Sequence, residues 1–288
     1  MKGLFVQVSS LPTPNYLTEL VTHIIQRHPE IREIVLSDVS FSHVPSLLQL
    51  QPLISMTFDK MYVGAPPFPW YGPRPDTPTD LQGWMLPVGG AAGMLTPSYR
   101  WDSIYADEAI AAALIPQGWE WYIGSEIGID ALGDHPRIRQ GWEAYLIELC
   151  RRLYAYGATD VLWSPYAWDA WATVSTYRRG RVAVAMKTLV GNIKTYSGTL
   201  GVTGIDLQDS RGAQPQEPAT DAVNWYRLIK GCGATVRINM ELFTPYLTPE
   251  DKEVIAHRAA YYREEDVPVG CCWEARYWLV PMFANHLE

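Results

Sequence analysis

The sequence predicts a single (β/α)8 TIM barrel that spans residues 1–288. Short apolar runs alternate with segments whose apolar residues have helical spacing, which is the order of such a barrel. Three of the runs end in acidic or amide residues, at 121–126, 205–209 and 236–241. The length also suits one barrel domain, because barrels routinely exceed the usual domain size.

The first two units of the repeat lie near the amino terminus. A strand is expected at 4–8, and apolar residues at helical spacing predict a helix within 17–25. A second strand is expected at 34–36, with Asp38 and Ser40 just beyond it. The alternation of strand and helix therefore begins at once.

Between residues 45 and 100 the repeat is lost in a segment rich in proline, glycine and aromatic residues. Long irregular segments in compact domains are commonly functional insertions. We therefore expect a Pro/Gly-rich insertion around the third strand, which we place at 53–58 or at 85–88.

The repeat then returns for the rest of the chain. Strands are expected at 119–124, 161–165, 204–207, 236–240 and 267–273, and helices at 104–114, 142–153, 182–196, 221–229 and from 248 onward. Gly157 follows the long amphipathic helix as a C-cap residue. A doubly wound open sheet is the structural alternative, although no GxGxxG motif follows the first strand.

The composition argues against several classes of partner. The net charge of -8 and the pI near 5.3 leave no basic stripe for nucleic acid or an anionic membrane. No apolar stretch reaches the roughly 18 residues of a membrane span, and the first residues do not resemble a signal peptide. We expect a soluble protein, cytoplasmic or released by a non-classical route such as phage lysis, and the oligomeric state stays open.

The 4 cysteines and 6 histidines have no spacing typical of a metal site. We therefore expect buried free thiols, no cofactor and no catalytic metal. The 12 tryptophans and 17 tyrosines suit a sugar-binding surface and a protein core equally well.

Acidic and amide residues gather where the predicted strands end, which is where a parallel barrel builds its active site. They are Glu126, Asp206, Asp209, Asn239, Glu241 and Glu274. Hydrolysis of a glycosidic bond needs one protonated carboxyl group and one carboxylate, so these residues supply enough acids for that chemistry. The alternative is that such acids cap the next helix or pair with Arg137, Arg211, Arg237 or Arg276.

Spacing by two residues places side chains on one face of a strand. Asn239 and Glu241 share a face in this way, which singles out Glu241. Asp206 and Gln208 also share a face, whereas Asp209 falls in the following turn, where it either serves the site or caps the turn. Tyr122 shares a face with Glu126 and would tune it through a hydrogen bond.

Five tryptophans follow strand ends, where an aromatic platform for a sugar ring would lie: Trp163, Trp168, Trp171, Trp273 and Trp278. Core packing is the alternative for most of them. We assign Trp163 and Trp273, with the neighbouring Glu274, to substrate contact.

Several of these motifs together resemble a family of bacterial domains of unknown function that adopt glycosidase-like TIM barrels and are classed with the glycoside hydrolase superfamily. The matching segments are Gly-Leu-Phe-Val-Gln at 3–7, Trp-Tyr-Ile-Gly-Ser-Glu at 121–126, Ser-Pro-Tyr at 164–166, Gln-Asp-Ser-Arg-Gly at 208–212 and Asn-Met-Glu-Leu-Phe at 239–243. They run in order through most of the chain, but the proline-rich region at 60–100 has no counterpart. The resemblance implies a barrel with a carbohydrate-directed site that includes Glu126, Asp209 and Glu241.

The sequence therefore favours a metal-independent glycoside hydrolase. We expect Glu126 to be the general acid, because its Trp and Tyr neighbours would raise its pKa by desolvation, and Glu241 to be the nucleophile or base. Gln208, Asp209 and Asn239 would orient sugar hydroxyl groups or water. Two alternatives stay open, a non-catalytic carbohydrate-binding or phage-associated barrel and a barrel enzyme of another kind, such as a lyase or isomerase.

Overall fold

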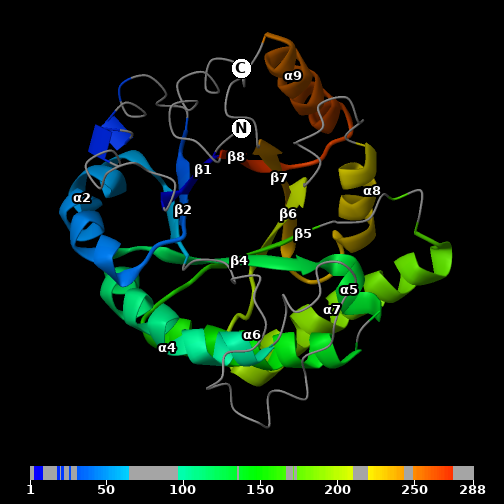
Figure 1. The fold of residues 1–288 in the computed structure, drawn as a ribbon, viewed down its shortest axis with the longest axis horizontal. Coiled ribbons are helices and arrows are strands. Elements are labelled where there is room, and N and C mark those ends of the chain that lie inside the picture. Colours follow the sequence, from blue (N-terminus) through cyan, green and yellow to red (C-terminus); the bar gives the residue numbers. More distant parts are fainter. Residues whose placement is uncertain are drawn as a thin grey trace.

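Eight parallel strands close into a barrel in chain order (Figure 1). The computed structural model describes residues 3–8, 18–19, 21–22, 26, 31–64, 97–134, 136–166, 171, 174–209, 220–242 and 249–274. Each strand pairs in parallel with the next, and β8 pairs with β1 through Gly3 and Cys271. This architecture confirms the predicted (β/α)8 fold.

The strands are short and are linked by helices that cover the outside of the barrel (Figure 1). The strands are β1 (Gly3–Gln7), β2 (Glu33–Ser37), β3 (Lys60–Val63), β4 (Glu120–Gly128), β5 (Val161–Tyr166), β6 (Gly204–Asp209), β7 (Thr235–Leu242) and β8 (Val269–Glu274). The helices are α2 (Val44–Thr57), α4 (Pro97–Leu114), α5 (Ile129–Asp134), α6 (Pro136–Ala155), α7 (Thr176–Ser197), α8 (Thr220–Ile229) and α9 (Pro249–Glu264), with short 3-10 turns η2 (Phe41–His43) and η4 (Ile115–Gln117).

The third strand lies at Lys60–Val63, so its expected position at 53–58 was wrong. That segment belongs largely to α2, and the other expected position, 85–88, lies outside the described residues. The helix was missed because it has no charged residue on its outer side and contains Pro52 in its interior, where proline normally interrupts a helix. Residues 45–63, which the sequence assigned to the irregular segment, thus form most of a helix and a strand.

Other boundaries follow local signals that the repeat alone does not reveal. Helix α7 begins before the expected residue 182, because the Ser175 hydroxyl group accepts a hydrogen bond from the backbone N–H of Arg178. Gly157 has a φ of 99° after α6, which confirms its C-cap role. Strands β4 and β6 extend beyond the expected residues, and the helix expected within 17–25 falls only partly in the described residues.

Two layers of apolar side chains fill the barrel and its helical coat. A cluster inside the barrel consists of Phe5, Val35, Tyr62, Tyr122 and Leu162. The intervening strand residues face the helices and join the larger outer core. Since both faces of a parallel sheet are buried, strands such as β2 contain continuous apolar runs, whereas β7 alternates because its interior positions include Arg237 and Asn239.

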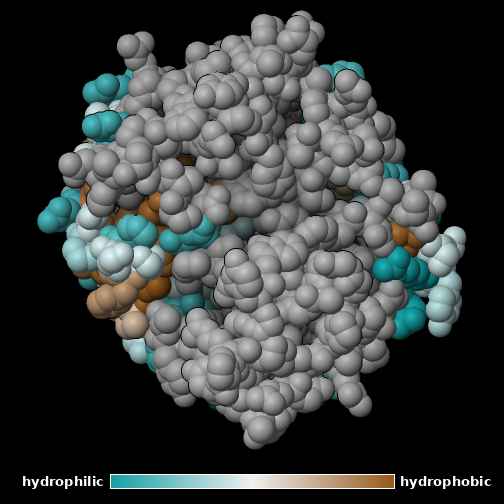
Figure 2. Space-filling view, in the orientation of Figure 1, coloured by the Kyte–Doolittle hydropathy of each residue, from teal (hydrophilic) through white to brown (hydrophobic). Residues whose placement is uncertain are grey.

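One part of the outer surface is apolar. Phe41, Leu48 and Met56 are exposed along η2 and α2, and hydrophobic residues gather over that helix in Figure 2. Among the described residues, the helices are all too short or too polar to cross a membrane.

Candidate active site

The contacts of two consecutive residues show which face of β7 points into the barrel. Arg237 reaches across the barrel to Glu33 of β2, whereas Ile238 packs against Val223 of α8 and Tyr262 of α9. Because successive side chains on a strand point to opposite faces, Asn239 lies on the same interior face as Arg237. Glu241 follows two residues later, near the carboxyl end of β7, and its strand position continues the same face.

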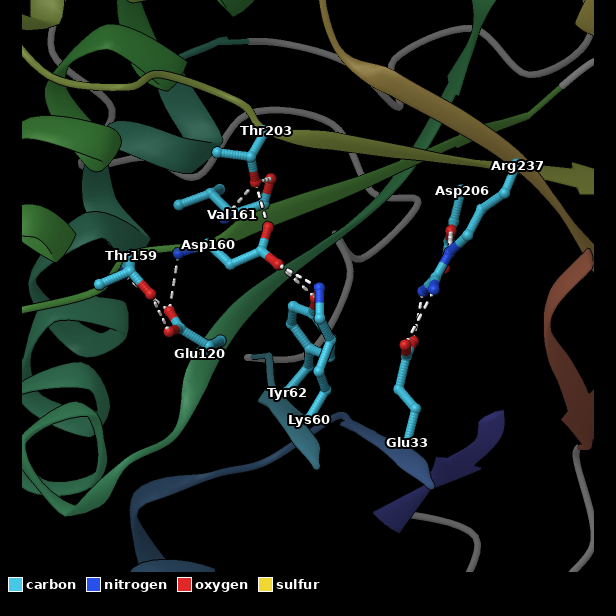
Figure 3. Close-up of polar contacts among 10 residues, drawn as sticks. All are labelled: Glu33, Lys60, Tyr62, Glu120, Thr159, Asp160, Val161, Thr203, Asp206 and Arg237. Carbon is cyan, nitrogen blue, oxygen red and sulfur yellow. Dashed lines mark hydrogen bonds and ion pairs between the residues drawn. The ribbon is translucent and has the colours of Figure 1, made fainter. Parts of the chain in front are cut away.

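A buried ionic network of Arg237, Glu33 and Asp206 lies inside the barrel (Figure 3). Arg237 precedes Asn239 by two residues on β7, so the network is on the amino-terminal side of Asn239. The guanidinium group of Arg237 donates to the Glu33 carboxylate, with 2.9 Å between Nη1 and Oε2. It also donates to the Asp206 carboxylate, with 3.1 Å between Nη2 and Oδ2. Gly270 leaves space for this side chain, because a Cβ at that position would collide with the guanidinium group. Full burial raises the pKa of Asp206, and Arg237 opposes that shift.

Asp206 is therefore not a residue of the strand end. It lies in the middle of β6, and its ion pair with Arg237 is the alternative that the sequence left open. Asp209, by contrast, is the last residue of β6 rather than part of a turn.

A second polar network joins the amino-terminal ends of β3 and β5 (Figure 3). The Asp160 carboxylate accepts hydrogen bonds from Lys60 at 2.9 Å, from Tyr62 at 2.6 Å, and from Thr203. Burial opposes ionisation of Asp160, but these donors lower its pKa below the ordinary value. Charges at this end of a TIM barrel contribute to stability rather than to chemistry.

The predicted site acids all lie near the carboxyl ends of their strands. Glu126 is near the end of β4, Asp209 ends β6, Glu241 is next to the end of β7, and Glu274 ends β8. The barrel is closed and parallel, so these positions share one rim. The side chains of the predicted residues Glu126, Gln208, Asp209, Glu241, Trp273 and Glu274 lie outside the part of the chain that the structure describes.

The pairing register shows which of these positions are neighbours. Gln208 pairs with Asn239 between β6 and β7, and Glu241 pairs with Trp273 between β7 and β8. Strand β4, which contains Glu126, is separated from β7 by β5 and β6. The backbone thus groups Gln208, Asn239, Glu241 and Trp273 on adjacent strands, with Glu126 farther around the rim.

Two predicted aromatic contacts occupy different layers. Tyr122 is buried inside the barrel, where its ring meets the edge of Phe5 at a centroid distance of 5.1 Å. The β4–β5 register shifts after Gly124, so simple alternation does not carry the face of Tyr122 onward to Glu126. Trp163 is fully buried in the outer core and lies 6.3 Å from the Trp142 ring of α6, which is the core-packing alternative.

Asn239 combines burial with unused hydrogen-bonding capacity. Its side chain has 0% exposure, and among the residues that the structure describes neither Nδ2 nor Oδ1 has a hydrogen-bond partner. Buried amide groups are nearly always paired, so an unpaired one calls for a physical explanation.

One further acid lies at the same rim and was not among the predicted site residues. Asp38 directly follows β2, is buried, and has a φ of 58°, which is unusual for a residue other than glycine. His43 lies nearby, and burial lowers its pKa while Asp38 opposes that shift. The position of an acid just beyond the second strand was the available sequence signal. No three His, Cys, Asp or Glu residues of the described ranges gather as a metal site would require.

Comparison with known proteins identifies the fold. No family model and no curated protein match the sequence. A thermostable mutant of a xylanase from Cellvibrio japonicus aligns with a TM-score of 0.50 and 14% identity, over 94% of this chain and 85% of that one. A broad-specificity endoglucanase from Clostridium acetobutylicum gives a TM-score of 0.54 and 11% identity, over 96% and 88% of the two chains.

A trimodular endoglucanase structure gives a TM-score of 0.56 and 11% identity, over 99% of this chain and 59% of that one. These structural neighbours are glycoside hydrolase TIM barrels. At such low identity they establish the fold alone, and the resemblance to domains of unknown function stays a prediction.

Proposed function

We propose that the protein is a glycoside hydrolase that cleaves an oligo- or polysaccharide with two carboxyl groups, those of Glu126 and Glu241. The observation that carries this proposal is the position of both acids near the carboxyl ends of β4 and β7, on one rim of a closed barrel. Active sites of TIM barrel enzymes are built at that rim. The glycoside hydrolase neighbours support a carbohydrate as the substrate.

In this mechanism Glu126 is the general acid and protonates the leaving glycosidic oxygen. Glu241 either attacks the anomeric carbon or activates a water molecule. The assignment of the acid role to Glu126 keeps the prediction made from the sequence, in which its Trp and Tyr neighbours raise the pKa of its carboxyl group by desolvation. Gln208, Asp209, Trp273 and Glu274 would contact the sugar from β6 and β8, and the reaction needs no metal ion.

The test is hydrolysis of a glycan panel by the wild type and by Glu126→Gln and Glu241→Gln. We expect each substitution to lower kcat by a factor of about 10² or more, the range in which a positioned acid or base acts. Glu120→Gln is the matched control, since Glu120 begins the same strand as Glu126 and its carboxylate binds the backbone N–H of Thr159 at 2.9 Å. That variant should remain active.

Full activity in both site variants would refute the carboxyl pair. A wild type that binds a glycan without cleaving it would instead indicate a carbohydrate-binding barrel. Proton NMR of the first product distinguishes retention from inversion of the anomeric centre, which depends on whether the carboxyl groups are about 5 Å or about 6.5–9.5 Å apart.

A further inference from the structure

The interior of the barrel changes character toward the carboxyl ends of the strands. Four of the five residues of the inner cluster, Val35, Tyr62, Tyr122 and Leu162, are each followed two residues later by a small residue. These are Ser37, Gly64, Gly124 and Ser164, all of them buried. Bulky branched side chains dominate TIM barrel interiors, so a layer of small residues just below the rim is unusual.

Asn239 lies near the same end of the barrel on β7, and the described residues around it do not pair with its amide group. Arg237, two residues earlier, donates to Glu33 and Asp206. The Ser164 hydroxyl group donates to the backbone carbonyl of Asp206 at 2.9 Å. Within the described part of the chain, both amide atoms of Asn239 are without a hydrogen-bond partner.

A carboxamide offers one acceptor and two donors, and burying them unpaired is unfavourable. A hydroxyl oxygen fits both ends of the amide, because it donates to Oδ1 and accepts from Nδ2. The side chain is 0% exposed, so the cost of leaving the amide unpaired falls on a fully desolvated group.

We propose that the Asn239 carboxamide binds one hydroxyl group of the sugar residue at the base of the active site, and so determines specificity for sugars that carry this group. The inference rests on the proposed glycoside hydrolase function. Asn239 precedes Glu241 by two residues on the same strand, which places a recognised hydroxyl group beside the proposed reacting centre. A bound water molecule has the same hydrogen-bonding chemistry, and the experiment separates these two sources.

The experiment measures glycan binding by calorimetry in the Glu241→Gln background, where hydrolysis is suppressed. The probes are the glycan cleaved best in the hydrolysis panel and its singly deoxygenated versions. Asn239→Leu removes the amide group, and Asn239→Asp keeps its shape while removing the Nδ2 donor. Asn192→Leu is the matched control, because the Asn192 amide on α7 donates to Glu143 at 3.1 Å and lies outside the barrel.

We expect Asn239→Leu to weaken binding of the parent glycan by a factor of about 10–100. One of the deoxy glycans should bind with the same low affinity whether residue 239 is asparagine or leucine. A site that pairs with a substrate hydroxyl group discriminates strongly against the analogue that lacks it. Asn239→Asp should show the same loss in smaller degree, and it serves as the test if the leucine variant does not fold. Asn192→Leu should lower the melting temperature and leave the Kd unchanged.

Equal affinity of Asn239→Leu and its parent for every glycan would overturn the inference while leaving the hydrolase function intact. If Asn239→Leu shifts the melting temperature by the same amount with and without glycan and changes nothing else, the amide binds a water molecule instead. A wild type that neither binds nor cleaves any glycan would refute the proposed function and this inference together.

Discussion

Replacement of Arg237 by methionine should destabilise the protein strongly. The variant leaves the Glu33 and Asp206 carboxylates inside the barrel without their cation. The side chains of Arg237, Glu33 and Asp206 are 18%, 8% and 0% exposed, so solvent screens them little. Removing one partner of a buried ion pair costs about 3–5 kcal/mol, and with an unfolding entropy of about 2.1 cal/mol/K per residue this lowers the Tm by about 5–8 °C.

The loss should also depend on pH. Without Arg237, burial raises the folded-state pKa of the Asp206 carboxyl group further above its ordinary value, because the opposing cation is gone. An acid with a raised folded pKa costs stability when it is ionised, and this cost disappears as the pH falls below the unfolded pKa. The Tm difference between variant and wild type should therefore be largest at pH 7 and shrink toward pH 4.

Thermal melts followed by circular dichroism at several pH values measure both effects. Arg32→Met is the control, since Arg32 and Asp59 form an ion pair with side chains 48% and 65% exposed, and surface pairs contribute little. The reasoning is refuted if Arg237→Met melts within 2 °C of the control at about pH 7, or if its deficit does not change with pH.

Two further predictions concern packing and reactivity. Gly64→Ala should destabilise the protein by about 1–3 kcal/mol, because its Cβ would collide with the backbone of Tyr122. Gly191→Ala, on the open helical surface of α7, should stabilise the protein by about 0.5–1 kcal/mol. Urea denaturation measures both changes. A result of the same sign for both would contradict this interpretation of the barrel interior. Burial raises the pKa of the Cys150 thiol to about 12, so peptide mapping after alkylation at pH 8 should find it unmodified until the protein is unfolded; rapid native labelling would refute that.

The barrel was predictable because its signal repeats. Apolar runs and amphipathic helices recur along the chain, and an error in one unit does not disturb the others. The unit that failed contains α2, whose exposed residues mix apolar and polar side chains without any charge and whose interior includes Pro52. A helix without a charged face and with an internal proline lacks both patterns by which a sequence indicates a helix.

The placement of single side chains was less predictable, for a reason specific to parallel sheets. Both faces of a strand are buried, so alternation distinguishes two faces without showing which one lines the barrel. Leu162 faces inward and Trp163 outward, although both are apolar. Asp206 illustrates the same limit, because the partner that explains its burial, Arg237, lies on another strand.

Strand β7 carries a residue of the stabilising ionic network, Arg237, and a proposed catalytic residue, Glu241, at well-separated positions. Arg237 and Glu241 are four residues apart, which corresponds to about 13 Å along a strand. At that distance and an effective dielectric constant of about 20, loss of one charge changes the energy of the other by about 1.3 kcal/mol, or just under one pKa unit. Proton uptake by Asp206 in Arg237→Met restores part of the lost positive charge, because burial already raises the pKa of this carboxyl group. The variant should therefore lose stability while the pH profile of hydrolysis moves by less than about one unit, and a larger displacement would mean that the buried network sets the ionisation of the rim acids.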